Sequence, residues 1–274
     1  MKRQRYLAPA REAVDPAAFA APPLVDWCEY DALLRGPHWP AIDDLNVRRH
    51  DAAMPHFAAQ DAALLADGLH YEQRIAERGL VATRERNWHD LFNALVWLRY
   101  SALKAALNRR QVREIARMGP RQRSRPQYAM THFDEAGVIV RVADPALLAL
   151  WDAHNWHGLF WRERAAWIDG RIAVTVFGHA LLEHALVPGK LLVGKALVFA
   201  AGVHVPMEDL VHAAAAAIEA GAALNDPLEL RPLPLSGIPG WHADNGEEAF
   251  HRAAPCYQPR RAGRDYPPAL RLPA

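Results

Sequence analysis

Two histidines stand beside other polar groups inside apolar stretches of this sequence. His89 lies between Trp88 and an apolar run that reaches Val96, and His179 opens the stretch His179-Ala180-Leu181-Leu182-Glu183. A polar group that is buried without a partner costs about 1–3 kcal/mol. We therefore expect each histidine to have a structural or a chemical role.

The spacing around these histidines is compatible with metal binding. His179 and Glu183 are four residues apart on a predicted helix, so their side chains share a face at about 6 Å. His89 and Asn93 have the same spacing on another predicted helix. If the two helices pack face to face, His89, His179 and Glu183 could ligate one divalent metal ion and leave a position open for water.

This ligand set predicts a metal-assisted hydrolase, with a phosphate ester as one candidate substrate. Asp90 would orient a ligand imidazole from outside the coordination shell. Asn93 and Lys104 complete the candidate catalytic residues. A divalent metal is the one cofactor that the pattern suggests, and the ligand or substrate would be an unidentified small molecule.

The same residues also permit an interpretation without catalysis. His179 could donate to a backbone carbonyl or to Asp90, and Glu183 could pair with an arginine, within a buried hydrogen-bond network. The chain would then be a non-catalytic module that binds a small ligand or a partner protein. Metal-free acid–base chemistry is a further alternative, so the residues leave open whether the chain is an enzyme.

An arginine-rich segment raises a weaker alternative, which is nucleic-acid binding. Residues 109–125 contain seven arginines and one acid, Glu114. Such a segment can hold phosphates. Arginines without interleaved aromatic residues are weak evidence, however, and a solvated helix face explains them more simply.

Two further groups of polar residues are candidates for parts of a site. A single helix from Arg84 to Leu107, capped by Thr83, would place the ends of a stripe from His89 to Asn108 about 28 Å apart. Lys104 and Asn108 would then lie far from His89 and Asn93. Asp134 and Glu135 are predicted in a hairpin turn, where acids usually bond to the backbone, and a metal-binding carboxylate is the alternative.

The elements that must position these residues form a mixture of helices and strands. Periodicity and capping residues predict helices over 61–77, 84–107, 111–118, 144–151, 179–186 and 207–222, a hairpin over 128–142, and strands over 171–177 and 192–200. The order predicts an α+β fold: a small mixed β-sheet of about four strands, made of the hairpin and a βαβ unit, packed by the long helix and shorter helices.

The chain divides by composition into three parts. Residues 1–60 are predicted to form a loop-rich arm that Trp27, Trp39 and Phe57 attach to the body. Residues 61–230 would form the α+β core domain, and residues 231–274 an irregular tail, rich in proline and glycine, that wraps the same domain.

Bulk composition excludes several classes of protein. The 274 residues are 51% hydrophobic and 23% charged with net charge +1, which is a globular composition without a strong overall field. Cys28 and Cys256 stand alone, so a thiolate zinc site is not expected. No apolar signal segment follows the basic start, and Leu191–Val205 is too short to span a bilayer. We therefore expect a soluble, cytoplasmic protein without a membrane partner.

Several separated motifs resemble the signature of a bacterial family, the domain-of-unknown-function family 3025. They are Trp88–Trp97 with Lys104 and Leu107-Asn108, Phe133–Gly137, Phe177–Glu183, and Pro232–Pro239 with Gly240-Trp241. The resemblance extends from about Leu69 to Arg261 and implies a shared fold and motif set, but no activity. The family is expected to carry a proline near Ser101, and its loss here would straighten the helix.

Overall fold

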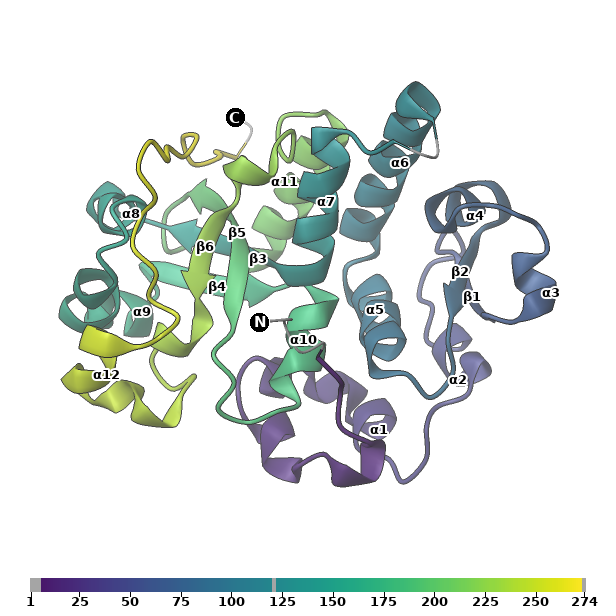
Figure 1. Ribbon diagram of the computed structural model, residues 1–274, viewed down its shortest axis with the longest axis horizontal. Coiled ribbons are helices and arrows are strands. Elements are labelled where there is room, and N and C mark those ends of the chain that lie inside the picture. Colours follow the sequence, from purple (N-terminus) through teal and green to yellow (C-terminus); the bar gives the residue numbers. More distant parts are fainter. Residues whose placement is uncertain (1–5, 120–121, 273–274) are drawn as a thin grey trace.

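A four-stranded mixed sheet forms the centre of the fold, in the strand order β4-β3-β5-β6 (Figure 1). The computed structural model describes residues 6–119 and 122–272. β3 (Gly137–Val142) pairs in parallel with β5 (Val193–Ala200) and antiparallel with β4 (Ile172–Val176), and β6 (Arg231–Pro234) runs antiparallel to β5. Every residue of β3 is buried, as expected for a central strand covered on both faces. The predicted α+β class with a small mixed sheet is confirmed.

The predicted hairpin over 128–142 is wrong in its first half, which is a helix. Ser124 Oγ accepts from the backbone N–H of Gln127, and Gln127 Oε1 accepts from the backbone N–H of Ser124. This capping box starts α7 (Arg125–Ala136), and Pro126 lies within its first turn. Asp134 and Glu135 consequently lie in the last turn of a helix instead of a hairpin turn.

The predicted βαβ unit is also wrong. β4 is antiparallel and β5 is parallel to β3, which lies between them, so β4 and β5 run in opposite directions and do not pair. The intervening helix, α10 (His179–Ala185), was placed correctly in the sequence. The local sequence therefore predicts the order strand, helix, strand correctly. Strand pairing, in contrast, depends on contacts between residues that are distant in sequence.

The predicted long helix is broken into α5 (Trp88–Arg99) and α6 (Ser101–Met118). The break falls at Tyr100, whose φ and ψ are −124° and 44°. Its ring packs 5.9 Å from the rings of Trp27 and of Phe177. The expectation of a straight helix near Ser101 is thus wrong, because the helical segment breaks at this partly buried tyrosine without any proline.

Two predicted helices differ in extent from those in the structure. Asn87, and not Thr83, caps α5, since its side chain accepts from the backbone N–H of Asp90. Thr83 instead ends β2 (Leu80–Thr83), which pairs in parallel with β1 (His56–Ala59). The predicted helix 61–77 is interrupted at Gly68, whose φ is +65°, and forms α3 (Ala62–Leu65) and α4 (Tyr71–Arg78).

Most of the remaining helices lie around the four-stranded sheet, and two short ones near the N-terminus lie away from it (Figure 1). Two were predicted closely: α8 (Pro145–Asp152), capped by Asp144, and α11 (Met207–Glu219). The others are short: α1 (Asp31–Leu34), α2 (Ile42–Asn46), α9 (Arg164–Ile168) and α12 (Glu248–Ala253). α8 and α11 contact β3, and α7 contacts β3 and β5, so the helices bury the sheet. Within the described ranges, no helix is long and apolar enough to cross a membrane.

Segments at both ends of the chain pack onto this body. Trp27 and Phe57 are buried, and the ring of Trp39 lies 4.7 Å from that of Trp88. Near the other end, Leu270 forms a parallel bridge with Phe199 of β5. Cys28 and Cys256 are free thiols.

Candidate metal centre

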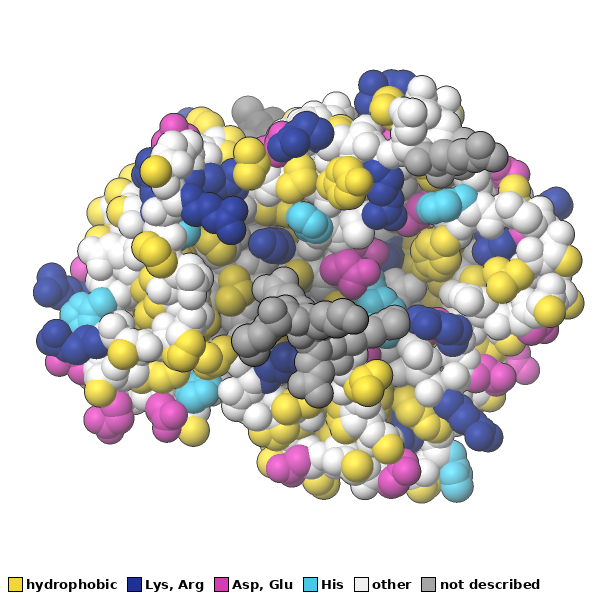
Figure 2. Space-filling model, viewed as in Figure 1, with side chains coloured by type: hydrophobic (Ala, Val, Ile, Leu, Met, Phe, Trp, Pro, Cys, Tyr) yellow, Lys and Arg dark blue, Asp and Glu magenta, His cyan; other side chains and the backbone are white. Residues whose placement is uncertain are grey.

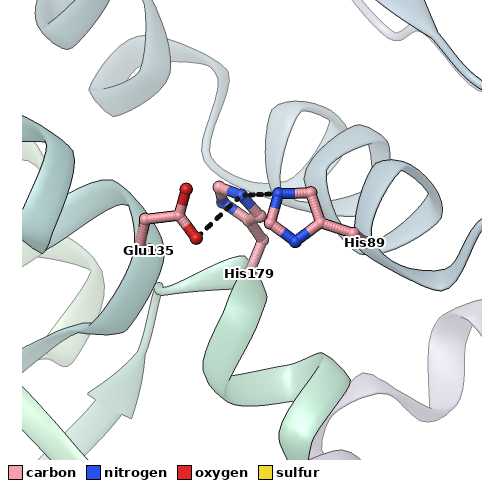
Figure 3. Close-up of side chains that lie close together, drawn as sticks. All are labelled: His89, Glu135 and His179. Atoms are coloured by element: carbon pink, nitrogen blue, oxygen red, sulfur yellow. Dashed lines mark hydrogen bonds and ion pairs between the residues drawn. The ribbon is translucent and has the colours of Figure 1, made fainter. Parts of the chain in front are cut away.

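Two imidazole rings meet where α5 packs against α10. His89 Nε2 lies 3.0 Å from His179 Nε2, and the ring planes are inclined by 76° (Figure 3). His89 occupies the first turn of α5 because Asn87 caps that helix, and His179 is the first residue of α10. Residues that are 90 positions apart in sequence are thus brought together by helix packing.

Glu135 is the third member of this cluster. Its Oε2 lies 3.8 Å from His179 Nε2, and one ligand atom from each of His89, Glu135 and His179 lies within 4.8 Å of the other two (Figure 3). Two imidazole nitrogens and one carboxylate oxygen form a donor set that suits Zn²⁺ and related ions. The sequence placed Glu135 in a hairpin turn and offered a metal-binding carboxylate there only as an alternative, without joining it to the two histidines.

A close backbone contact holds α7 and α10 together at this point. The backbone N–H groups of Phe177 and Gly178 both donate to the carbonyl of Gly137, at 3.0 and 2.8 Å. A Cβ atom at Gly178 would lie 2.5 Å from Cα of Ala136 and from N of Gly137. The glycine before His179 therefore allows the imidazole to lie beside Glu135.

Glu183 lies on the other side of His89 from the cluster. Its Oε2 is 3.1 Å from His89 Nδ1, whereas His89 Nε2 faces His179. The predicted metal ligand is therefore a partner of His89 and lies outside the three-residue group. A carboxylate at Nδ1 holds the proton there and leaves the Nε2 lone pair directed at the centre.

Asp90 does not orient an imidazole, contrary to the sequence-based expectation. Its carboxylate accepts three hydrogen bonds from Arg84: from the backbone N–H at 2.6 Å, from Nε at 3.0 Å and from Nη2 at 2.7 Å. Neighbouring residues on a helix point about 100° apart, so Asp90 faces a different side from His89. Glu183 takes the orienting position instead.

Burial and charge shift the pKa values of the two histidines in opposite directions. The hydrogen bond to Glu183 raises the pKa of His89, with the charge of Glu135 adding to it and burial opposing it. Burial lowers the pKa of His179 to about 3, and the positive charge of Lys104 contributes in the same direction. His179 is therefore neutral at pH 7, which is the form that ligates metals. Burial also raises the pKa of Glu135.

A second polar group centres on Lys104, which is 4% exposed. Its Nζ donates to Oδ1 of Asn93 at 2.9 Å and to Oδ1 of Asp134 at 2.6 Å, and Asn93 Nδ2 donates to the hydroxyl of Tyr71 at 2.9 Å. The expectation that Lys104 lies far from Asn93 is wrong, because the helix breaks between them. Burial alone would raise the pKa of Asp134, but the charge of Lys104 and its hydrogen bond outweigh burial and lower that pKa.

The two groups line one pocket of about 330 Å³. His89, Glu135 and His179 form one part of its wall, and Lys104 contributes to another. Asn108 also lines it and donates through Nδ2 to the backbone carbonyl of Glu72 at 2.9 Å and to its Oε2 at 2.6 Å. Burial raises the pKa of Glu72, although Asn108 opposes this effect. The pocket is thus polar and carries several ionisable groups, as functional sites often do.

Arginines of the arginine-rich segment bond to other parts of the protein. Arg109 forms a bidentate pair with Glu219, and Arg125 forms one with Asp226. Arg110 is buried and donates to backbone carbonyls, including that of Ile218 at 3.2 Å. These three arginines therefore attach α6 and α7 to neighbouring segments.

Comparison with known proteins gives one match. A family model described as "Protein of unknown function (DUF3025)" matches residues 55–261, a range that includes the histidine cluster, Glu183 and Lys104. This match confirms the resemblance noted in the sequence. None of the curated proteins and none of the solved structures compared with the chain matches it.

Proposed function

This chain belongs to the DUF3025 family, whose description names no activity, and from the site we propose that it is a metal-assisted hydrolase. His89, Glu135 and His179 would hold one divalent ion. The proposal depends on a single observation: ligand atoms of these residues lie within 4.8 Å of one another in the wall of a polar pocket. An ion with three protein ligands keeps a position for a water molecule and activates it as a nucleophile.

The surroundings of the three residues support this assignment. Glu183 holds the proton of His89 on Nδ1, and burial keeps His179 neutral, so both Nε2 atoms can serve as ligands. Nδ1 of His179 is buried without a hydrogen-bond partner among the described residues, and Asp134 Oδ2 is 3.9 Å away. A bound cation would add a favourable interaction to a ring whose burial is otherwise costly.

Lys104 would act on the substrate from the other part of the pocket. Its ammonium group is held by Asn93 and Asp134 and lines the same cavity as the histidines. A fixed cation in a partly desolvated pocket stabilises negative charge that develops on a reacting oxygen. The proposed roles are therefore a metal centre at one wall and a fixed positive charge at another.

Metal analysis of protein purified without a histidine tag tests the proposal. We expect about one equivalent of zinc, manganese or iron per chain, and strong loss of binding in His89→Ala, His179→Ala and Glu135→Gln. His184→Ala is the matched control, since His184 lies on the same helix outside the cluster and packs against Tyr6. Less than roughly a tenth of an equivalent, with melting unchanged by added metal, would refute the metal centre.

Hydrolysis is measured on the metal-loaded protein with chromogenic phosphate monoesters, phosphodiesters and carboxylate esters. Activity that disappears with chelation and in His179→Ala, but remains in His184→Ala, supports the hydrolase. Full metal occupancy without activity toward any of these classes would restrict the site to metal binding and contradict the hydrolase assignment.

A metal-free site for a small ligand is the second candidate function. It is favoured by a series of hydrogen bonds that needs no metal to be complete. The series connects Tyr71, Asn93, Lys104 and Asp134. Under this alternative, chelators leave thermal stability unchanged, and a small polar ligand stabilises the wild-type protein more than Lys104→Met.

A further inference from the structure

One face of α7 carries a row of side chains that ends at the proposed metal centre. Tyr128, His132 and Glu135 follow one another at spacings of four and three residues, so their side chains share a face of the helix. The side chain of Tyr128 is conspicuously open to solvent, at 47% exposure for a large aromatic residue. Glu135 at the end of this row belongs to the metal cluster, about 10 Å along the helix from Tyr128.

Positively charged side chains surround this row. The guanidinium of Arg123 lies 5.9 Å from the ring centroid of Tyr128. Burial and the charge of Lys195 lower the pKa of His132. Burial, and then the charges of Arg264 and Arg261, lower the pKa of Lys195. Figure 2 shows dark blue and cyan side chains over α7, β5 and the C-terminal tail on one face of the molecule.

These cations lack acidic partners within the described part of the chain. Arg123, Lys195, Arg261 and Arg264 form no ion pair there. The nearby Asp226 is occupied by Arg125. In a chain of net charge +1, this is a local excess of positive charge beside an exposed aromatic ring.

We infer that this surface, formed by Arg123, Tyr128, His132, Lys195 and Arg261, binds single-stranded nucleic acid and presents its phosphodiesters to the metal centre. Unpaired cations attract the phosphates, and an exposed aromatic ring between them offers a stacking surface for a base. The cleavage part of the inference rests on the proposed hydrolase. Water would add to phosphorus as one P–O ester bond breaks, giving a phosphomonoester and an alcohol. One water proton goes to the leaving oxygen and the other to solvent.

Binding is measured apart from cleavage, by fluorescence anisotropy of a labelled twenty-nucleotide oligo(dT) in EDTA. We expect log K to fall with log salt with a slope of about −2 to −3, as for three or four phosphate contacts. Tyr128→Ala should weaken binding about tenfold, and Tyr128→Phe should restore it. The double variant Arg123→Glu with Arg261→Glu should flatten the salt dependence. Arg162→Glu, an exposed arginine outside this surface, is the control.

The outcomes separate this inference from the proposed function. Salt-independent binding, or equal affinities for Tyr128→Ala and Arg162→Glu, would overturn nucleic-acid binding whatever the metal content. Equal or tighter binding of polyglutamate or of anionic lipid vesicles would overturn it as well. Salt-dependent, tyrosine-dependent binding by a protein that holds no metal would support the surface and refute only the hydrolase. Cleavage of the oligonucleotide after metal is restored would support both.

Discussion

The ammonium group of Lys104 donates to Oδ1 of Asn93 at 2.9 Å, across a break in the helical segment that carries both residues. In one continuous helix, eleven residues would separate their Cα atoms by about 16 Å. The bend at Tyr100 thus brings a buried cation back to the pocket that contains His89 and His179. This relationship determines which residues can act together.

Replacing Lys104 should strongly destabilise the fold. Lys104→Met leaves Asp134 without its cation in a mostly buried setting, and we expect a loss of roughly 3 kcal/mol in the free energy of unfolding, measured in urea. Adding Asp134→Asn to the Lys104→Met variant should recover part of the lost free energy of unfolding. Arg35→Met, which breaks the exposed pair with Asp31, should cost less than about 1 kcal/mol. Similar losses of stability in Lys104→Met and Arg35→Met would contradict the claim that the buried pair is the more important one.

Glu183 should control metal affinity without being a ligand. Glu183→Ala removes the carboxylate that orients His89, and we expect metal affinity to fall about 10–100-fold. Glu183→Gln can keep the hydrogen bond but not the charge, so its loss should be smaller. Titration calorimetry measures both, with Glu208→Gln, an exposed acid on α11, as control. Complete loss of the metal in Glu183→Gln would instead indicate direct ligation.

Gly178 should be essential for the approach of α7 to α10. Gly178→Ala places a Cβ against backbone atoms of Ala136 and Gly137, and we expect a loss of about 1–3 kcal/mol together with weaker metal binding. Gly246→Ala is the matched control, because nothing lies within 4 Å of the added Cβ and its φ is not positive. Thermal unfolding and metal titration are the measurements. A neutral effect of Gly178→Ala would show that this contact is not required.

Acid should destabilise the protein partly through His251, far in sequence from the proposed metal centre. Its ring is buried between the hydroxyl of Tyr257 and the carbonyl of Asn245, and burial lowers its pKa. Below about pH 6.5 the unfolded chain therefore binds a proton that the folded chain resists. The stabilisation is fully present above that pH and is lost as the pH falls toward the folded-state pKa.

Urea unfolding at about pH 7.5 and about pH 5.5 checks this direction. The wild-type protein should lose stability at the lower pH, and His251→Gln should lose less. An equal decrease in both proteins would assign the acid sensitivity to other groups.

Several parts of the fold follow from local sequence alone. Asp144 followed by Pro145 marks the start of α8, and the β-branched stretch from Ile172 to Val176 forms β4 as expected. These features depend on caps, turns and side-chain periods within a few residues. The same local logic misassigned residues 128–136, since an apolar run of that length suits a strand or a buried helix equally.

The sequence by itself determined that this is an α+β protein of the DUF3025 family, and it identified the candidate site residues His89, Asp90, Asn93, Lys104, His179 and Glu183. These polar residues stand within apolar segments, which is a property of the local sequence. Only the tertiary structure decided that Glu135 joins the two histidines, that Glu183 stands behind His89, and that Lys104 reaches the same pocket. Those relationships arise because the helical segment breaks at Tyr100, whose ring packs against Trp27 and Phe177, and because α7 and α10 approach at Gly178. Both depend on packing between segments that are distant in the chain.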